Sequence, residues 1–397
     1  MQIGEVASFQ NGYAFKSKDF VQDGKYKTIK IKELKNGKVR FFNDSVSVNV
    51  DDERIIEKYI VEKGDVLFAL TGDPVNKNNP LSWVGRVSIY EDDQLALLNQ
   101  RVCKLVPNEE LNAKYIYYYF RAFNNFYALA SIAKGSASQA NISTKDIEAM
   151  EIDLPSLIIQ NKIVSVLDSI EEKINQNNKI NKNLEEQAQS IFANEFLSLA
   201  TLPKGWKQAS LIDIADYLNG LAMQKYRPTA DESGIPVLKI KELRQGCCND
   251  NSELCSPSIK SDYIIHDGDV IFSWSGSLLV DFWCGGTCGL NQHLFKVTSN
   301  IYDKWFYYSW TNYYLQKFAA IAADMATTMG HIKREELAKS RVLIPSNSDY
   351  ERIGGLLAPL YDLVISNRIE NSKLATIRDT LLPKLMTGEL DVSNINL

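Results

Sequence analysis

The segment YIVEKGDVLF at residues 59–68 returns as YIIHDGDVIF at residues 263–272, and this repetition decides the fold. Working outward, IKIKEL at residues 29–34 returns as LKIKEL at 238–243, and LNQ at 98–100 returns at 290–292. Upstream, Gly12 and Gly220 lie in matching segments. Because the matches keep their order, the chain is predicted to contain two related globular copies.

Each copy leads through a proline, Pro155 or Pro345, into a long segment with helical periodicity. Inside the copies, short β-branched and aromatic runs alternate with turn residues, and aromatic-rich stretches have the pattern of amphipathic helices covering a sheet. The predicted fold class is therefore α+β, with two tandem mixed α/β domains, each followed by a long helix. The predicted divisions are 1–155 (first domain), 156–200 (first helix), 201–346 (second domain) and 347–397 (second helix and tail).

Both long segments carry a heptad seam, which predicts that the two helices pair as an antiparallel coiled coil with pseudo-two-fold symmetry. At 1.5 Å per residue, each helix would be about 60 Å long. Asn177 and Asn367 occupy the two midpoints, where we expect them to hydrogen-bond and fix the register; the alternative is that both face solvent. The seam residues are Ile163, Leu167, Ile170, Ile174, Asn177, Leu184 and Ile191, followed by Ile353, Leu357, Leu360, Val364, Asn367, Leu374 and Leu381.

Composition narrows the classes of protein. The 397 residues are 45% hydrophobic, which is enough for each copy to bury a core. We see neither a signal peptide nor an apolar run long enough to span a membrane, so we expect a cytoplasmic protein. The net charge of −5 hides a strongly basic stretch between Lys16 and Arg40, which could hold phosphate.

Six cysteines lie in no repeated pattern, and we interpret them as reduced thiols. The alternative is a zinc site made by cysteines of the second copy with His293, but paired Cys-x-x-Cys spacing is lacking. Neither the Asn/Asp-Pro-Pro-aromatic motif of adenine methyltransferases nor a P-loop occurs. These observations argue against intrinsic catalysis and a metal.

Four further segments carry a family resemblance: MEIDLP up to Pro155, RVLIP up to Pro345, LPKGW with LIDIADYLNG at 202–220, and TLLPKLMTGEL at 380–390. In this order they resemble the specificity subunit of type I restriction-modification systems. The first copy lacks an LPKGW counterpart, and we expect the C-terminal tail to complete its opening strand.

The resemblance implies a subunit that binds double-stranded DNA and catalyses nothing itself. It implies no cofactor in this chain, because two partner methylation subunits would bind S-adenosylmethionine and methylate adenine, and a restriction subunit can join them. Two domains on one helical spacer would read two half-sites about one DNA turn apart, roughly 34 Å. The alternative function is a non-catalytic coiled-coil adaptor that binds only proteins.

Candidate DNA contacts follow from this resemblance, with most of the Lys and Arg candidates on phosphates. Side chains of the variable loops are expected near bases, namely Asn76, Lys77 and Arg86 in the first domain and Trp274, Ser275 and Ser277 in the second. The loops at 71–97 and 275–289 differ most between the copies, which favours recognition there, although neutral drift gives the same difference. A surface role without contact stays open for each lysine, and an ordinary turn for residues 134–143. The candidates are Lys16, Lys27, Lys30, Lys32, Asn76, Lys77, Arg86, Lys134, Ser136, Ser138, Gln139 and Asn141 in the first domain, and Lys225, Arg227, Lys239, Lys241, Trp274, Ser275, Ser277, Thr327, Thr328, His331 and Lys333 in the second.

Overall fold

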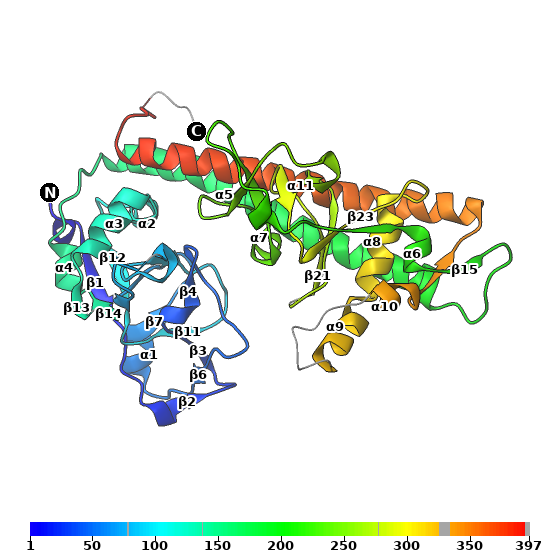
Figure 1. Cartoon of the computed structure of the whole chain (residues 1–397). Coiled ribbons are helices and arrows are strands. Elements are labelled where there is room, and N and C mark those ends of the chain that lie inside the picture. Colours follow the sequence, from blue (N-terminus) through cyan, green and yellow to red (C-terminus); the bar gives the residue numbers. More distant parts are fainter. Residues whose placement is uncertain (78, 137, 277, 325–333, 394–397) are drawn as a thin grey trace. The chain divides into compact units, whose positions relative to one another are not determined.

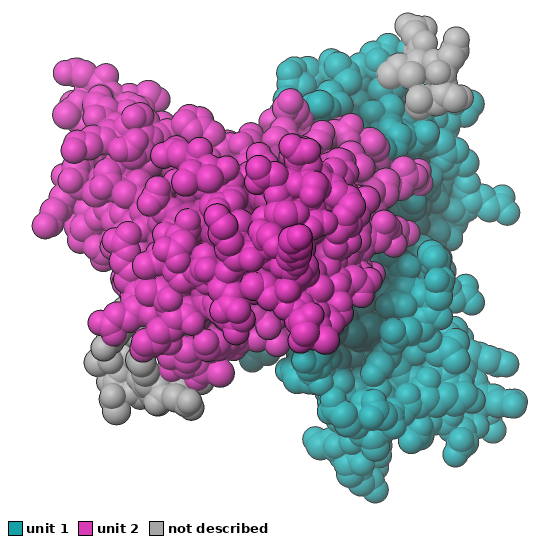
Figure 2. Space-filling model, turned by 90° about the vertical axis from the view of Figure 1, so that its right-hand side faces the viewer, with its two compact units in different colours: residues 1–171, 377–397 teal, residues 172–376 magenta. Residues whose placement is uncertain are grey.

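The computed structural model describes residues 1–77, 79–136, 138–276, 278–324 and 334–393. The chain forms two compact units, coloured separately in Figure 2. Unit 1 contains residues 1–171 and 377–397, and unit 2 contains residues 172–376. Both long helices, α5 (Leu157–Phe192) and α11 (Asn347–Met386), therefore contribute residues to both units.

Unit 1 is built on two main β-sheets and a small third one (Figure 1). The first sheet has the order β1 (Ala7–Asn11), β12 (Val102–Pro107), β8 (Val66–Ala69), β10 (Val87–Ile89), β5 (Lys38–Val39) and β4 (Leu34–Lys35). The second has the order β2 (Phe20–Val21), β6 (Ser47–Val48), β3 (Tyr26–Ile29), β11 (Ala96–Leu98) and β7 (Ile60–Val61). The third joins β13 (Lys134–Ser136), β14 (Gln139–Asn141) and β9 (Thr71–Gly72), and the helices are α1 (Glu53–Tyr59), α2 (Ala113–Tyr119), α3 (Phe123–Ser131) and α4 (Thr144–Glu148).

Unit 2 repeats the same plan. Its first sheet has the order β16 (Asp216–Asn219), β23 (Leu294–Thr298), β20 (Val270–Ser273) and β21 (Leu279–Phe282), and its second has β18 (Leu254–Cys255), β17 (Ile235–Leu238), β22 (Cys288–Leu290) and β19 (Ile264–Ile265). A two-stranded sheet pairs β15 (Lys207–Ser210) with β24 (Arg341–Ile344), and the helices are α6 (Leu211–Ile214), α7 (Ile240–Gln245), α8 (Lys304–Tyr313), α9 (Leu315–Asp324) and α10 (Arg334–Ala338). The matching strand orders confirm the predicted α+β duplication.

The repeated apolar runs form the central strands. All four residues of β8 and all four of β20 are buried, as expected for strands covered on both faces. The predicted aromatic helices pack over the sheets that contain these strands. In unit 1 the rings of Phe68 and Phe120 meet edge to face with centroids 5.5 Å apart, and in unit 2 Phe282 of β21 stacks on Tyr308 of α8 at 4.0 Å. Aromatic pairs of this kind add to the apolar burial that stabilises each core.

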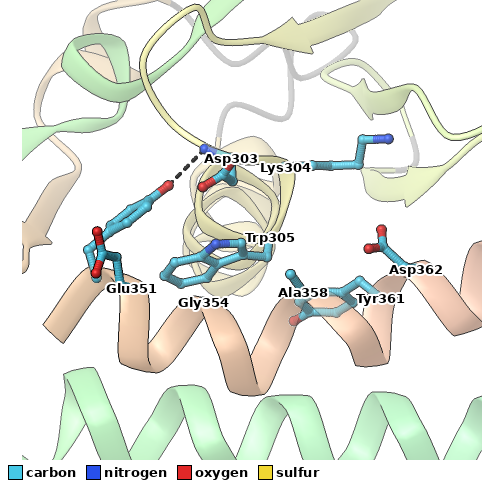
Figure 3. Close-up of a pocket in the computed structure, with 9 residues that line it drawn as sticks. Asp303, Lys304, Trp305, Glu351, Gly354, Ala358, Tyr361 and Asp362 are labelled. Carbon is cyan, nitrogen blue, oxygen red and sulfur yellow. Dashed lines mark hydrogen bonds between the residues drawn. The ribbon is translucent and has the colours of Figure 1, made fainter. Parts of the chain in front are cut away.

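Helix α8 attaches the second domain to α11 within unit 2. Trp305, at the start of α8, projects toward Gly354 on α11 (Figure 3), and a Cβ on Gly354 would lie 3.0 Å from Trp305 Nε1. The backbone N–H of Asp303 donates to the Tyr350 hydroxyl at 2.7 Å. Around this joint lies a cavity of about 410 Å³ lined by both helices. Because Gly354 has no side chain, α8 and α11 can approach each other closely at this point.

The seam residues of α5 and α11 are all shielded from solvent to some extent. Ile163, Leu167, Asn177, Ile353, Leu357, Val364 and Asn367 are buried, whereas Ile170, Ile174, Leu184, Ile191, Leu360, Leu374 and Leu381 are half-buried. Contacts inside unit 2 run in opposite directions along the two helices, from Arg352 with Glu195 to Lys173 with Glu370. The pairing in unit 2 is therefore antiparallel, as predicted.

Asparagines do occupy the middle of this pairing, but the predicted bond between Asn177 and Asn367 is wrong by one helical turn. Asn177 Nδ2 donates to Asn371 Oδ1 at 2.9 Å, and Asn367 Nδ2 donates to Asn181 Oδ1 at 2.8 Å. Asn177 also donates to Glu370 at 2.7 Å. Each helix carries two asparagines one turn apart, so crossed pairing gives all four a partner. The two crossed bonds are related by the expected pseudo-two-fold symmetry.

The expectation that the C-terminal tail completes the opening strand of the first copy needs correction. The N-terminus itself pairs there, since Gln2 bridges to Glu151 and the Ile152 backbone N–H donates to the Met1 carbonyl at 2.9 Å. The tail instead buries Val392 in the core of unit 1, and its described residues, 387–393, form no strand.

At the start of α11, Ser346 and Asp349 form the helix cap. Ser346 Oγ donates to Asp349 Oδ2 at 2.8 Å and accepts the Asp349 backbone N–H at 3.3 Å. Among the described residues, no helix has the length and apolar character needed to cross a membrane.

Candidate nucleic-acid interface

In the first domain the backbone of Gly12 packs closely against the backbone of Asn99. A Cβ on Gly12 would lie 2.3 Å from the carbonyl oxygen of Asn99, so no larger residue fits without moving backbone. In the second domain a Cβ on Gly220 would lie 2.2 Å from the Asn291 carbonyl oxygen. The repeated glycine and the repeated Leu-Asn-Gln are therefore two halves of one joint, which we call the Gly–Asn joint.

In the first domain the structure brings two predicted recognition segments together. Strand β14 pairs with β9, so Asn141 lies opposite Thr71, and the Thr71 hydroxyl donates to Asn141 Oδ1 at 2.8 Å. The variable loop after residue 71 and the 134–143 segment thus share one small sheet. Gly135 is required there, because a Cβ would meet the Gln139 carbonyl oxygen at 2.1 Å.

The side chains of this small sheet and its loop are available to a ligand. Lys134 keeps only a long contact of 3.5 Å with Asp146, and the hydroxyls of Ser136 and Ser138 lie 3.1 Å apart. Short polar groups on exposed backbone are suited to close contact with DNA. The exposed candidates here are Asn76, Lys77, Lys134, Ser136, Ser138, Gln139 and Asn141.

Some lysines of the predicted basic stretch contact an aromatic ring or an acidic side chain, and others form no ion pair among the described residues. Lys30 Nζ lies 3.4 Å from the centroid of the Phe20 ring, and burial lowers its pKa despite nearby Glu33. Lys32 pairs with Asp44 at 2.9 Å. Lys16 and Lys27 form no ion pair among the described residues, so no acidic side chain there competes with a phosphate for them.

Arg86 lies differently from the other candidates, because its guanidinium turns inward. It donates to the carbonyls of Leu81 and Ile31, and burial lowers its pKa in spite of Asp73. It lines a cavity of about 300 Å³ with Ser88, and neither Arg86 Nε nor Ser88 Oγ has a hydrogen-bond partner. This placement favours a role in holding the loop.

In the second domain, Arg227 and Lys239 share Glu253 at 3.1 and 2.5 Å, whereas Lys225 and Lys241 are exposed. Glu253 keeps a pKa below its usual range, first through its hydrogen bond with Lys239. The predicted contacts at Ser277, Thr327, Thr328, His331 and Lys333 lie outside the described residues.

Trp274 and Ser275 join a polar cluster that the sequence analysis only partly identified. Trp274 Nε1 donates to Asn219 Oδ1 at 3.1 Å, and its ring centroid lies 6.5 Å from that of His293. Ser275 Oγ lies 3.2 Å from His293 Nδ1, and Gln292 Nε2 lies 3.4 Å from His293 Nε2. Position in the repeat could have pointed to these residues, since Gln292 ends the repeated Leu-Asn-Gln segment and His293 directly follows it.

The described cysteines are all free thiols, with Cys103, Cys255, Cys284 and Cys288 buried. Within the ranges that the structure describes, no group of three or more His, Cys, Asp or Glu side chains has the arrangement of a metal site. The apolar surroundings raise the pKa of Cys284 to about 11, which keeps this thiol protonated at neutral pH.

Comparisons with known proteins agree with the duplicated architecture. The chain is similar to the MjaIX type I restriction enzyme specificity subunit of Methanocaldococcus jannaschii, with 25% identity covering 99% of this chain and 96% of that protein. It is 18% identical to the HindI specificity subunit of Haemophilus influenzae, over 88% and 92% of the two chains.

A crystal structure of the type I S subunit from M. genitalium has the same fold, with a TM-score of 0.60, 16% identity, and coverage of 97% of this chain and 95% of that one. The family model for the type I restriction modification DNA specificity domain matches residues 1–186 and again residues 203–377. The chain therefore belongs to the type I restriction modification DNA specificity family and carries two tandem copies of its domain.

Proposed function

We propose that this chain is the non-catalytic DNA-specificity subunit of a type I restriction-modification complex, in which each domain reads one half of a bipartite double-stranded DNA target. One observation carries the proposal: the same Gly–Asn joint occurs in both domains, but different polar side chains surround it. A constant scaffold with changed side chains is what two readers of different half-sites need.

Affinity would come from cations without acidic partners. Lys16, Lys27 and Lys77 in the first domain, and Lys225 and Lys241 in the second, form no ion pair within the described ranges. Neutralising phosphates with such groups releases counterions, so DNA binding would weaken steeply as salt rises. The net charge of −5 then reflects acidic residues elsewhere in the chain.

Partner methylation subunits would bind along the long helices. On α11, Leu356 and Leu363 are exposed apolar side chains seven residues apart, so they lie on one helix face. An exposed apolar stripe of this kind is suited to a protein partner. In this proposal S-adenosylmethionine is bound by those partners, and this chain supplies the address.

The direct test is a gel-shift assay across a salt series, using the full chain in complex with its methylation subunits and duplexes carrying the methylated motif. We expect specific binding that weakens with a log–log slope of several units. Lys16→Gln with Lys27→Gln should lower that slope by about 2, roughly 1 per lost phosphate contact. Lys63→Gln serves as the control, because this exposed lysine of the first domain is paired with Asp93 at 2.9 Å and should leave the slope unchanged.

The competing function, a coiled-coil adaptor for proteins alone, predicts a different result. Under that function the complex would assemble but would shift no duplex at any salt concentration. This outcome would contradict the DNA-specificity proposal.

A further inference from the structure

Resting on the proposed function, we propose that Arg101 and His293 are structurally equivalent base-reading positions, and that Arg101 reads a guanine in the major groove of the first half-site. Both residues directly follow the repeated Leu-Asn-Gln segment. Neither residue was among the DNA-contact candidates from the sequence, because the repeated letters end at Gln100 and Gln292.

The equivalence rests on backbone hydrogen bonds that match one for one. In the first domain Tyr13 N donates to Leu98 O at 2.8 Å and Gln100 N donates back to Tyr13 O at 3.0 Å. In the second domain Leu221 N donates to Leu290 O and Gln292 N donates to Leu221 O, both at 2.9 Å.

The tight turn that carries each residue also matches. Val102 N donates to Asn99 O at 2.9 Å across Arg101, and Leu294 N donates to Asn291 O at 3.0 Å across His293. Each turn is held from the other side by a glycine N–H, Gly12 to Val102 O and Gly220 to Leu294 O, both at 3.0 Å. The two side chains therefore leave the same rigid turn.

Arg101 stands next to the other candidate contacts of its domain. Leu70 N donates to the Arg101 carbonyl at 2.9 Å, and Ile142 N donates to the Leu70 carbonyl at 3.0 Å, so Leu70 connects the turn to the small sheet of β9 and β14. The Arg101 side chain is exposed and forms no ion pair within the part of the chain that the structure describes. A free guanidinium on a rigid turn can present two parallel N–H donors.

Those two donors are the reason for assigning guanine. Guanine is the base that presents two acceptors, O6 and N7, at its major-groove edge, and a bidentate Arg contact to them is the commonest specific pairing. His293 cannot supply this fork, since an imidazole has two nitrogens on opposite sides, and Ser275 and Gln292 lie at those nitrogens. The two domains thus place different chemistry at one position, as readers of different half-sites require.

The test measures binding of the complex to a set of duplexes, each changed at one base pair of the first half-site. For Arg101→Gln we expect the roughly tenfold to 100-fold discrimination at one G·C pair to disappear or to shift toward A·T, because Gln pairs with adenine. Arg101→Lys should keep the guanine preference. Discrimination at every other position, and throughout the second half-site, should stay as in the wild type.

Arg40→Gln is the matched control, since Arg40 is also exposed and has no ion pair among the described residues of unit 1. It should leave discrimination unchanged at every base pair. Unaltered discrimination in Arg101→Gln, or a uniform loss of binding at all sequences, would overturn the assignment. Either result would contradict the role of Arg101 but would be compatible with the proposed function. A wild-type complex that binds all duplexes equally would contradict the proposed function.

Discussion

At the scale of single residues, two glycines and two asparagines form a contact that repeats in both domains beside the proposed DNA contacts. The sequence shows them as repeated letters, and the structure explains the repetition by contact between Gly12 and Asn99 and between Gly220 and Asn291. Because the contact is with a backbone carbonyl, the side chain of the asparagine can vary more easily than the glycine. The joint fixes the turn from which the next residue projects.

This joint gives a prediction for stability. Gly220→Ala should destabilise unit 2 by about 1–3 kcal/mol, because its Cβ must displace backbone atoms. Gly355→Ala is the matched control, since a Cβ there meets nothing within 4 Å and should stabilise helix α11 by about 0.4–1 kcal/mol. Chemical denaturation of the two variants measures both effects. Equal midpoints for Gly220→Ala and the wild type would contradict the contact.

Glu171 is a largely buried carboxylate of unit 1 that pairs with two arginines. Burial by itself would raise the pKa of Glu171. Arg121 at 3.2 Å and Arg378 at 2.8 Å together lower it by more than burial raises it, so the pKa lies below the ordinary value of 4.5. A depressed folded pKa means that this carboxylate stabilises the fold above about pH 4.5. That contribution is lost as the pH falls through the lower, folded value.

We therefore expect Glu171→Gln to cost about 1.5–3 kcal/mol at pH 7, since it removes hydrogen bonds to two charged partners. The cost should shrink as unfolding is measured at progressively lower pH. Glu172→Gln, an exposed neighbour on α5, should change little at any pH. A pH-independent cost for Glu171→Gln would show that the ion pairs are not its origin.

Candidate site residues show how far a sequence can be interpreted at this scale. Lys134, Ser136, Gln139 and Asn141 are exposed, as a DNA contact requires, because small polar runs rarely form cores. The inward turn of Arg86 could not be predicted, since it depends on the carbonyls of Leu81 and Ile31 that the folded loop brings within reach. Tertiary contacts of this kind leave no periodic signal in the chain.

At the scale of elements, the pairing of α5 with α11 depends on the four asparagines. Heptad spacing correctly predicted both helices, their antiparallel direction in unit 2 and the asparagines between them. It could not fix the register, because Asn177 and Asn181 occupy one face of α5 a turn apart, and either could meet Asn367. Only crossed pairing satisfies both, and a buried amide without a partner costs about 1–3 kcal/mol.

A double-mutant cycle tests this register. Asn181→Ala and Asn367→Ala should each lower the unfolding free energy of unit 2. The double variant should lose about 1 kcal/mol less than the sum of the two single losses, because each single variant already breaks the hydrogen bond that the two residues share. Lys179→Ala, exposed on the other side of α5, should add to Asn367→Ala without coupling. Full additivity for the asparagine pair would refute the crossed bonds.

At the scale of the whole molecule, both ends of the chain build unit 1. Leu382, Leu385 and Met386 of α11 and Val392 of the tail lie in the same core as Ile163 and Leu167 of α5. The sequence predicted this return only in outline, and it assigned the opening strand to the tail where the structure has Met1 and Gln2. A pairing made through the single bridge of Gln2 to Glu151 involves too few residues for a sequence pattern to identify the partner.

The central claim is that two related domains read two different half-sites at a distance set by the helices between them. Methylome sequencing of cells that express this chain with its methylation subunits tests the claim most directly, because it reports both half-sites and their separation. We predict methylated adenines in a motif of two short, unlike half-sites separated by a fixed run of unread base pairs. A contiguous motif, or a motif recognised through one half-site alone, would contradict the account.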